Sequence, residues 1–336
     1  MKKVWAIVAA GVLLAGAAAL SFFESYRGFQ GETFVQLDRG AGSAAIARTL
    51  AQAGVIRYAW QFWILRAMEP SARLQAGEYR FAGPATAREV FGRIARGDVY
   101  YLEFTVPEGS NMFDIARSLE ATGAMPAEDF LRAAADPSPI HDLDPEAKTL
   151  EGYLFPATYR LAHSTTAAEL CKQMTGQFRR QWKMLAAART AEVHHTVTLA
   201  SLVEKETRLS DERPLVAGVF ANRLRKGMLL ECDPTTIYAA LLDGRYRGAI
   251  HRSDLASQNA YNTYRNPGLP PGPIANPGSD AIAAALDPSE TDYLFFVAKP
   301  SGGSHQFSAG LAAHQKAVRE YRHGSKNVRK TARKAG

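Results

Sequence analysis

The chain has 336 residues, of which 46% are apolar and 22% are charged. This balance excludes disordered and collagen-like proteins, and the length suits roughly two domains of about 150 residues each. The formal net charge of +7 comes from two lysines at the N-terminus and five basic residues in segment 323–336. Because the rest of the chain is neutral overall, the charge does not support a nucleic-acid-binding protein.

Residues 4–23 form an apolar run without a charged side chain, and two lysines precede it. A helix of this length spans about 30 Å, the thickness of the apolar core of a bilayer. The lysines predict that residues 1–3 stay in the cytoplasm. A cleaved signal peptide is the alternative, but the small residues at 15–19 lie inside the apolar run rather than after it. We therefore expect an uncleaved, single-pass anchor in an inner membrane, with the following domains in the periplasm.

A strand–turn–helix pattern occurs twice, at an offset of 69 residues. The matching residues are Gly40, Ile46, Arg48, Leu50 and Gly54 in the first copy and Gly109, Ile115, Arg117, Leu119 and Gly123 in the second. Each copy predicts a short strand, a turn and an amphipathic helix that ends at a glycine. The pair is either a scaffold or a glycan-binding region of the LysM kind, over residues 34–135.

Segment 136–144 is rich in proline and aspartate, and it predicts a boundary before a second domain over residues 145–322. The expected fold class is therefore α+β, with an N-terminal transmembrane helix, a LysM-like α/β repeat region and a mixed α+β second domain. The basic segment 323–336 predicts a disordered tail. This tail is either a solvated end or a segment attracted to anionic lipid or cell-wall polymer.

Segment 196–207 predicts a helix with one stripe formed by Leu199, Leu202, Val203 and Glu206. Glu204 points roughly the opposite way, so the pattern places a single carboxyl group, that of Glu206, in an apolar setting. Burial raises the pKa of a carboxyl group, and a carboxylic acid that is protonated near neutral pH can serve as a general acid. The alternative is a structural Glu206 that pairs with Arg208 or Arg213.

Further polar residues follow this helix. Asn222 lies on or beside the buried stripe of the next helix, and Asp233 either caps a third helix or contacts a ligand. Five prolines stiffen the loop 266–278, which either binds ligand or is a structural crossover. The motif YNTY at 261–264 offers aromatic faces and neutral polar groups, which suit a sugar. His305 lies near a predicted hairpin turn, where a structural or hydrogen-bonding role is favoured.

Nothing in the sequence indicates a cofactor. No His, Cys, Asp or Glu spacing is typical of a metal site, and no nucleotide-binding fingerprint occurs. Cys171 and Cys232 allow at most one disulfide, and the sequence leaves their pairing open.

The ordered set of motifs resembles the endolytic murein transglycosylase family (MltG/YceG-like). The matching pieces are EGYLFPATY at 151–159, ASLVEKET at 200–207, VFANRL at 219–224, GM at 227–228, DPT at 233–235, YNTY at 261–264, GLPPGPI at 268–274, NPG at 276–278 and GSHQF at 303–307. Each piece alone is weak, but their order and spacing over nearly the whole chain are specific. Ala157, Glu231 and Cys232 depart from the pattern of the family, which affects the expected contacts around the substrate.

The resemblance implies an enzyme that cleaves peptidoglycan between N-acetylmuramic acid and N-acetylglucosamine within the strand and leaves a 1,6-anhydro end. It implies that Glu206 is the catalytic acid and that the domain over 145–322 is catalytic. Substrate contacts are expected from Glu151, Tyr153, Asn222, Asp233, Thr235, Tyr261, Asn262, Thr263 and His305. The expected partners are glycan strands, peptidoglycan synthases and, through residues 4–23, the membrane.

A lytic reaction needs one carboxyl group, whereas most glycosidases need two. Protonated Glu206 would donate its proton to the leaving oxygen, and the carboxylate would then accept the proton of the C6 hydroxyl as that oxygen attacks C1. Two other functions stay open at this point. One is a non-catalytic, membrane-bound protein that binds peptidoglycan, and the other is a hydrolytic muramidase, which would produce reducing ends.

Overall fold

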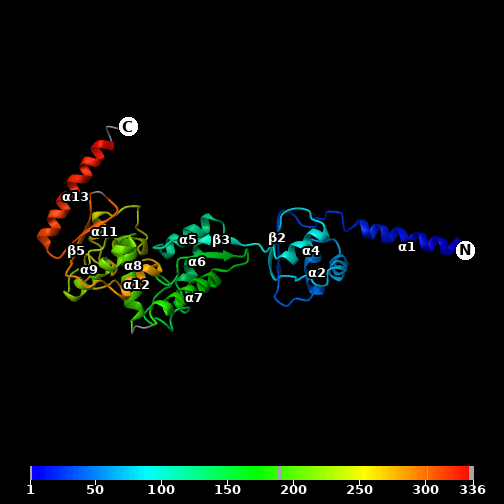
Figure 1. The fold of residues 1–336 in the computed structure, drawn as a ribbon, viewed down its shortest axis with the longest axis horizontal. Coiled ribbons are helices and arrows are strands. Elements are labelled where there is room, and N and C mark those ends of the chain that lie inside the picture. Colours follow the sequence, from blue (N-terminus) through cyan, green and yellow to red (C-terminus); the bar gives the residue numbers. More distant parts are fainter. Residues whose placement is uncertain (1, 188–190, 301, 333–336) are drawn as a thin grey trace. The chain divides into compact units, whose positions relative to one another are not determined.

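The structure, a computed structural model, describes residues 2–187, 191–300 and 302–332 (Figure 1). The chain divides into two compact units. Unit 1 comprises residues 1–103 and 160–164, and unit 2 comprises residues 104–159 and 165–336. The architecture is mixed α+β, as predicted from the sequence.

The N-terminal helix α1 covers Lys2–Leu20. Its window over residues 3–20 has a mean hydropathy of 2.0 and is long and apolar enough to cross a membrane. The chain after this helix is attached to unit 1 by Gln61, whose Nε2 donates to the carbonyl oxygen of Ser21 at 2.9 Å. The ring of Phe22 also packs edge-on against Trp60, with centroids 5.6 Å apart.

Unit 1 is built on an antiparallel pair of strands with helices between and after them. Strand β1 (Thr33–Leu37) pairs with β2 (Gly77–Phe81), and the helices α2 (Ser43–Gln52), α3 (Ala59–Met68) and α4 (Ala87–Arg96) complete the unit. The largest side chains of the shared core are Phe62, Tyr79, Phe81 and Phe91, which are all at most 1% exposed. Helix α4 begins with a capping box, in which Thr86 and Glu89 exchange hydrogen bonds.

The structure confirms that the sequence repeat is a repeat of local structure. Strand β3 (Leu102–Thr105) and helix α5 (Met112–Ala121) follow one another as β1 and α2 do. The four aligned glycines, Gly40, Gly54, Gly109 and Gly123, all have positive φ, between 69° and 81°. This backbone conformation favours glycine because other residues would bring Cβ too close to a carbonyl oxygen.

The two copies of the repeat belong to different units, so the expected boundary at 136–144 is wrong. Helix α5 contacts α6 (Ala127–Ala134), and α6 packs against α7 (Ala167–Leu185), which is well inside unit 2. Segment 136–144 is held in place by these helices, and Ile140 within it is fully buried. The division of the chain falls instead at β3 and its partner strand β4 (Thr158–Leu161).

The helix α8 (Val193–Glu206) lies at the centre of unit 2. Every residue from 196 to 204 is buried, and the helix contacts α9 (Arg213–Arg225), α10 (Asp233–Leu242) and α12 (Ser279–Leu286) (Figure 1). A short 3-10 helix, η1 (Ser210–Glu212), precedes α9, and α11 (Arg252–Leu255) follows α10. The surroundings of α8 therefore come from segments that are distant in the sequence.

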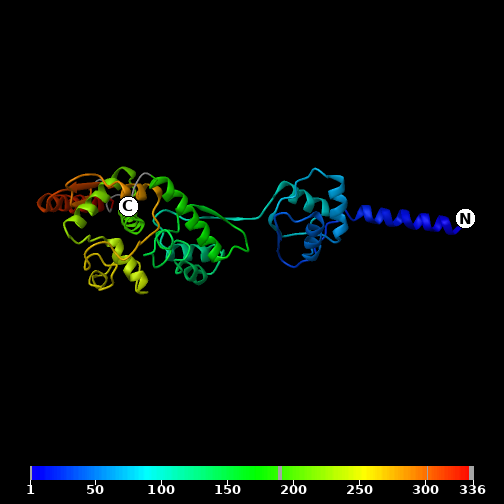
Figure 2. The ribbon, with the colours of Figure 1, turned by 90° about the horizontal axis from the view of Figure 1, so that it is seen from below.

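The chain ends with a hairpin and a long helix. Strands β5 (Phe295–Ala298) and β6 (His305–Ser308) pair antiparallel, and the predicted turn has positive φ at Gly302 and Gly303. Helix α13 (Leu311–Ala332, red in Figure 2) packs beside this hairpin. Residues 323–332 are thus helical where a disordered tail was expected, since alanine, lysine and arginine favour a helix. Residues 333–336 of that tail lie outside the described residues.

Gly152 tests the tight packing between segment 151–159 and α8. Its φ is +88°, and an added Cβ would lie 2.4 Å from Cγ of Pro273 and 2.9 Å from Cγ1 of Val197. We expect Gly152→Ala to lower the free energy of unfolding by about 2–4 kcal/mol in urea titrations. The control is Gly227→Ala, at φ +64° with no atom within 4 Å, for which we expect a loss of about 1 kcal/mol. Equal losses would contradict this account of the packing.

Candidate active site

A cavity of about 300 Å³ opens beside the C-terminal end of α8. It is lined by Glu206, Phe220, Arg223, Leu230, Glu231, Cys232, Asp233, Tyr264 and Phe296. The lining residues come from α8, α9, the segment 230–232 before α10, the first residue of α10, the loop after α11 and β5. Carboxyl groups, a guanidinium group and aromatic rings therefore meet around one hollow in unit 2.

Glu206 is the last residue of α8. The predicted face of this helix is buried, but so is every other side over residues 196–204, so the prediction of a single buried stripe is wrong. Leu199, Leu202 and Val203 are at most 2% exposed, and Glu206 continues their face to the cavity. The carbonyl groups at the C-terminal end of a helix point along its axis and carry partial negative charge. This position disfavours a second negative charge, so it favours the protonated form of the carboxyl group.

The pKa of Glu206 is raised, and burial of the side chain is the main cause. The negative charge of Asp233 raises the pKa further, whereas a hydrogen bond from Cys232 and the positive charges of His305 and Arg223 lower it without reversing the shift. No described cation forms an ion pair with Glu206. Its carboxyl oxygen Oε1 accepts a hydrogen bond from Sγ of Cys232 at 3.0 Å.

Two threonines fix the position of Cys232. Its backbone N–H donates to Oγ1 of Thr263 at 3.0 Å, and its carbonyl oxygen accepts from Oγ1 of Thr235 at 2.6 Å. Oγ1 atoms of the two threonines lie 2.9 Å apart. Burial raises the pKa of the Cys232 thiol well above its usual range, and the nearby Glu206 adds to this shift. The thiol therefore stays protonated and donates to the carboxyl group.

Glu204 is buried as well, and burial raises its pKa, so the expectation that the helix places a single carboxyl group in an apolar setting is wrong. The partners of Glu204 differ from those of Glu206. Its side chain is 5% exposed and pairs with Arg213 at 2.9 Å, and its second oxygen accepts from the backbone N–H of Gly278 at 3.0 Å. Arg213 also lies 3.4 Å from Asp280. This guanidinium group is therefore engaged by Glu204, and it does not form the structural pair with Glu206 that the sequence left open.

Asp233 and Tyr264 line the same cavity as Cys232. Asp233 is the first residue of α10, and its Oδ1 accepts from the hydroxyl of Tyr264 at 2.6 Å. Burial and this bond raise the pKa of Tyr264. Asp233 is exposed, so its carboxylate charge is accessible from the cavity.

His305 is held by Glu212 rather than by the cavity wall. Its Nδ1 lies 2.7 Å from Oε2 of Glu212, and its backbone N–H donates to Oε1 at 2.7 Å. Burial would raise the pKa of Glu212, but the bonds from His305 outweigh it and lower the pKa. These bonds to Glu212 agree with the favoured hydrogen-bonding role of His305, which does not line the cavity.

The other predicted contact residues support the fold rather than line the cavity. They are Glu151, Tyr153, Asn222, Thr235, Tyr261, Asn262 and Thr263. Asn262, for example, is fully buried and donates from Nδ2 to the carbonyl oxygens of Leu255 and Ser257. Tyr261 packs against Tyr238, with ring centroids 5.1 Å apart.

Glu151 and Tyr153 are buried, and neither lines the cavity. Oε2 of Glu151 accepts from the N–H of Met112 at 2.9 Å, and Oε1 accepts from Nδ2 of Asn276 at 2.9 Å. Burial raises the pKa of Glu151 to about 8. The hydroxyl of Tyr153 bonds to Asp144. These residues join the second copy of the repeat to the rest of unit 2.

The proline-rich loop is a crossover through the interior. Residues 272–278 are all buried, and Asn276 exchanges hydrogen bonds with Ser110, Gly109 and Leu154. The sequence left open whether this loop binds ligand or is a structural crossover, and these contacts agree with the structural crossover. In the YNTY motif at 261–264, which precedes this loop, only Tyr264 lines the cavity.

Sequence reasoning missed several residues that line the cavity. Phe220 and Phe296 lie on helix and strand positions that read as ordinary core. Arg223 directly follows Asn222 on α9, but only Asn222 is predicted from the sequence as a contact residue. Within the described residues, no three His, Cys, Asp or Glu side chains gather in a way that could hold a metal ion.

Comparison with known proteins assigns the chain to a family. The model of the YceG-like family matches residues 35–320. This chain belongs to the YceG-like family. A Bacillus subtilis protein named endolytic murein transglycosylase is 33% identical over 306 residues, which cover 85% of this chain and 84% of that protein. A Streptococcus pneumoniae protein of the same name is 27% identical, and the chain spans 58% of its length.

A solved structure supports the fold of this YceG-like chain. The crystal structure of a YceG-like protein from Listeria monocytogenes superposes with a TM-score of 0.57 and 30% sequence identity. The match covers 86% of this chain and 99% of that protein.

The bond from Cys232 makes a prediction about the acidity of Glu206. Because the thiol donates to the carboxylate, Cys232→Ala should raise the pKa of Glu206 further, and Cys232→Ser, a stronger donor, should lower it. NMR titration of a carbon-13-labelled Glu206 carboxyl measures both shifts. The control is Cys171→Ala, since Cys171 is a free, buried cysteine on α7. Identical titrations of Cys232→Ala and the parent would contradict the role of the thiol.

Proposed function

We propose that this chain is a membrane-anchored lytic transglycosylase that cleaves peptidoglycan within the strand, between N-acetylmuramic acid and N-acetylglucosamine. The observation that carries the proposal is the carboxyl group of Glu206. It lies in a cavity of about 300 Å³, and burial raises its pKa. The name of the relatives, endolytic murein transglycosylase, supports the same substrate class.

In the proposed reaction, Glu206 first acts as an acid and then as a base. Its proton passes to the glycosidic oxygen as the bond to C1 breaks. The resulting carboxylate accepts the proton of the C6 hydroxyl as that oxygen attacks C1 of the same sugar. The C1–O6 bond closes a 1,6-anhydro ring, and no water is consumed. The thiol of Cys232 supports the carboxylate between the two steps by donating a hydrogen bond to it.

Asp233 contributes negative charge beside the reacting centre. Its carboxylate raises the pKa of Glu206 and, through its exposure to the cavity, faces the positive charge that develops at C1. The bond from Tyr264 keeps this side chain in one place. A second carboxylate in the cavity also gives a specific reason to consider hydrolysis, in which Asp233 would be the partner of Glu206.

The cavity walls suit a sugar chain. Tyr264 and Phe296 offer aromatic surface for the C–H faces of sugar rings, while the carboxylate of Glu231 offers acceptors for hydroxyl and acetamido groups. Glycan binding by unit 1 is a further part of the proposal. Its order of elements, strand, helix, helix, strand, is a compact scaffold for a LysM-like module.

We place the active unit in the periplasm, close to the inner membrane. Helix α1 would cross the membrane with its lysine-bearing end in the cytoplasm, as the hydropathy of residues 3–20 supports. An enzyme held at the membrane would meet strands as they leave the peptidoglycan synthases, and cleavage there would limit strand length.

Glu206→Gln tests the proposed acid. The amide keeps the shape of the side chain but has no acidic proton to give, so we expect a loss of cleavage of at least about 100-fold on purified glycan strands. The control is Glu320→Gln on the exposed face of α13, which should cleave at the parental rate. Cleavage by Glu206→Gln near the parental rate would rule out the mechanism.

The product ends separate the lytic reaction from hydrolysis. Mass spectrometry of digested strands should show 1,6-anhydro ends, which lack one water relative to reducing ends. In water enriched in oxygen-18, the lytic products should carry no label. Labelled reducing ends would instead identify the chain as a muramidase, with Asp233 as the second carboxylate.

A further inference from the structure

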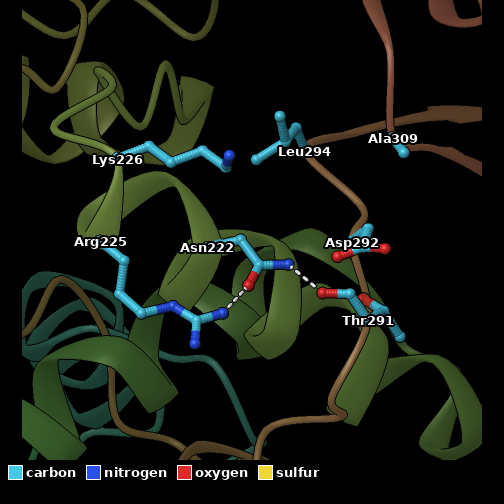
Figure 3. Close-up of a pocket in the computed structure, with 7 residues that line it drawn as sticks. All are labelled: Asn222, Arg225, Lys226, Thr291, Asp292, Leu294 and Ala309. Atoms are coloured by element: carbon cyan, nitrogen blue, oxygen red, sulfur yellow. Dashed lines mark hydrogen bonds between the residues drawn. The ribbon is translucent and has the colours of Figure 1, made fainter.

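A second cavity, of about 510 Å³, lies beside the C-terminal end of α9 (Figure 3). Arg225 and Lys226 lie on one side of it, and Thr291 and Asp292 lie on the other. Leu294 adds apolar surface. None of these side chains takes part in the chemistry at Glu206.

Asn222 lines this cavity, and the polar groups of its side chain are already hydrogen-bonded within the protein. Its Nδ2 donates to the carbonyl oxygens of Thr291 at 2.7 Å and Tyr293 at 2.9 Å, and its Oδ1 accepts from Arg225. The amide is 4% exposed, and both of its N–H groups are used. Asn222 therefore holds the guanidinium of Arg225 in position rather than binding a ligand itself.

Three charges around the cavity lack a partner of opposite sign. Among the side chains that the structure describes, neither Arg225 nor Lys226 pairs with a carboxylate, and Asp292 pairs with no cation. Two cations facing one carboxylate across a cavity complement a ligand that is itself dipolar. A phosphate group or a bare glycan would leave Asp292 without a partner, whereas a ligand with carboxylates and an ammonium group would satisfy all three charges.

We propose that this cavity binds the uncrosslinked stem peptide of peptidoglycan. The carboxylates of the stem lie against Arg225 and Lys226, and the free amine of its diamino acid lies against Asp292. The inference rests on the proposed function, because it names a part of the same substrate. It makes the enzyme selective for strands whose peptides are present and not yet crosslinked.

The two cavities share a wall, which lets one substrate fill both. Arg223 lines the cavity of Glu206, and its Nε donates to the carbonyl oxygen of Leu294 at 2.7 Å. Leu294 lines the second cavity. A peptide attached to a muramic acid residue near the cleaved bond can therefore extend along α9 and the segment before β5.

The test compares three substrates with the full chain. They are uncrosslinked strands with intact stem peptides, the same strands with the peptides removed by an amidase, and the same strands with the free amines acetylated. We expect the parent to have about a five- to tenfold higher kcat/KM on intact than on denuded strands, mainly through KM, because exposed charge pairs contribute modestly.

Two variants and one matched control identify the groups involved. The double variant R225Q/K226Q should bring the ratio of kcat/KM between intact and denuded strands to about one. D292N should remove the discrimination between free and acetylated amines. The control K316Q/R319Q removes two positive charges from the exposed face of α13 and should keep the parental ratios.

The outcomes separate this inference from the proposed function. Equal kcat/KM of the parent on intact and denuded strands, or an unchanged ratio in R225Q/K226Q, would overturn the peptide site while leaving the activity intact. If the parent cleaves no strand, NMR titration of the full chain with free L-alanyl-γ-D-glutamyl-diaminopimelate still tests the cavity. Binding that the double variant loses would support the site, and the absence of binding would overturn it.

Discussion

The site depends on one desolvated carboxyl group at the end of a buried helix. Glu206 loses water, faces the carbonyl end of α8 and has Asp233 nearby, and each of these disfavours its anion. The nearest guanidinium does not cancel the effect, because Arg223 is engaged by the carbonyl oxygens of Leu294 and Leu230. These effects shift the carboxyl group toward its protonated form, and the thiol of Cys232 donates a hydrogen bond to it.

Local signals in the sequence predicted local structure well. Periodicity predicted the helix that carries Glu206, but it could not show that α8 is buried on every side over residues 196–204. The glycines of the repeat marked turns because their conformation is set within a few residues. The contact between Glu206 and Cys232 joins two residues that are 26 positions apart, and no period connects them. Such a neighbour emerges only when α8 and the start of α10 are packed together.

The two copies of the repeat show why local similarity did not predict domain membership. Both copies form a strand, a turn and a helix, but their apolar faces have different partners. Helix α2 packs with α3, and α5 packs with α6 and, through Met112, with the buried Glu151. The same local fold therefore contributes to two different cores. The proline- and aspartate-rich segment 136–144 is an internal turn of unit 2.

The chain passes between the units more than once, since residues 160–164 belong to unit 1 although they follow unit 2 residues. His163 stacks on Phe34 with ring centroids 4.1 Å apart, and its N–H donates to Glu78. A gene truncated to begin at residue 104 would thus leave this short loop without the surface it covers. Separating the two units cleanly would require a short polar turn in place of residues 160–164.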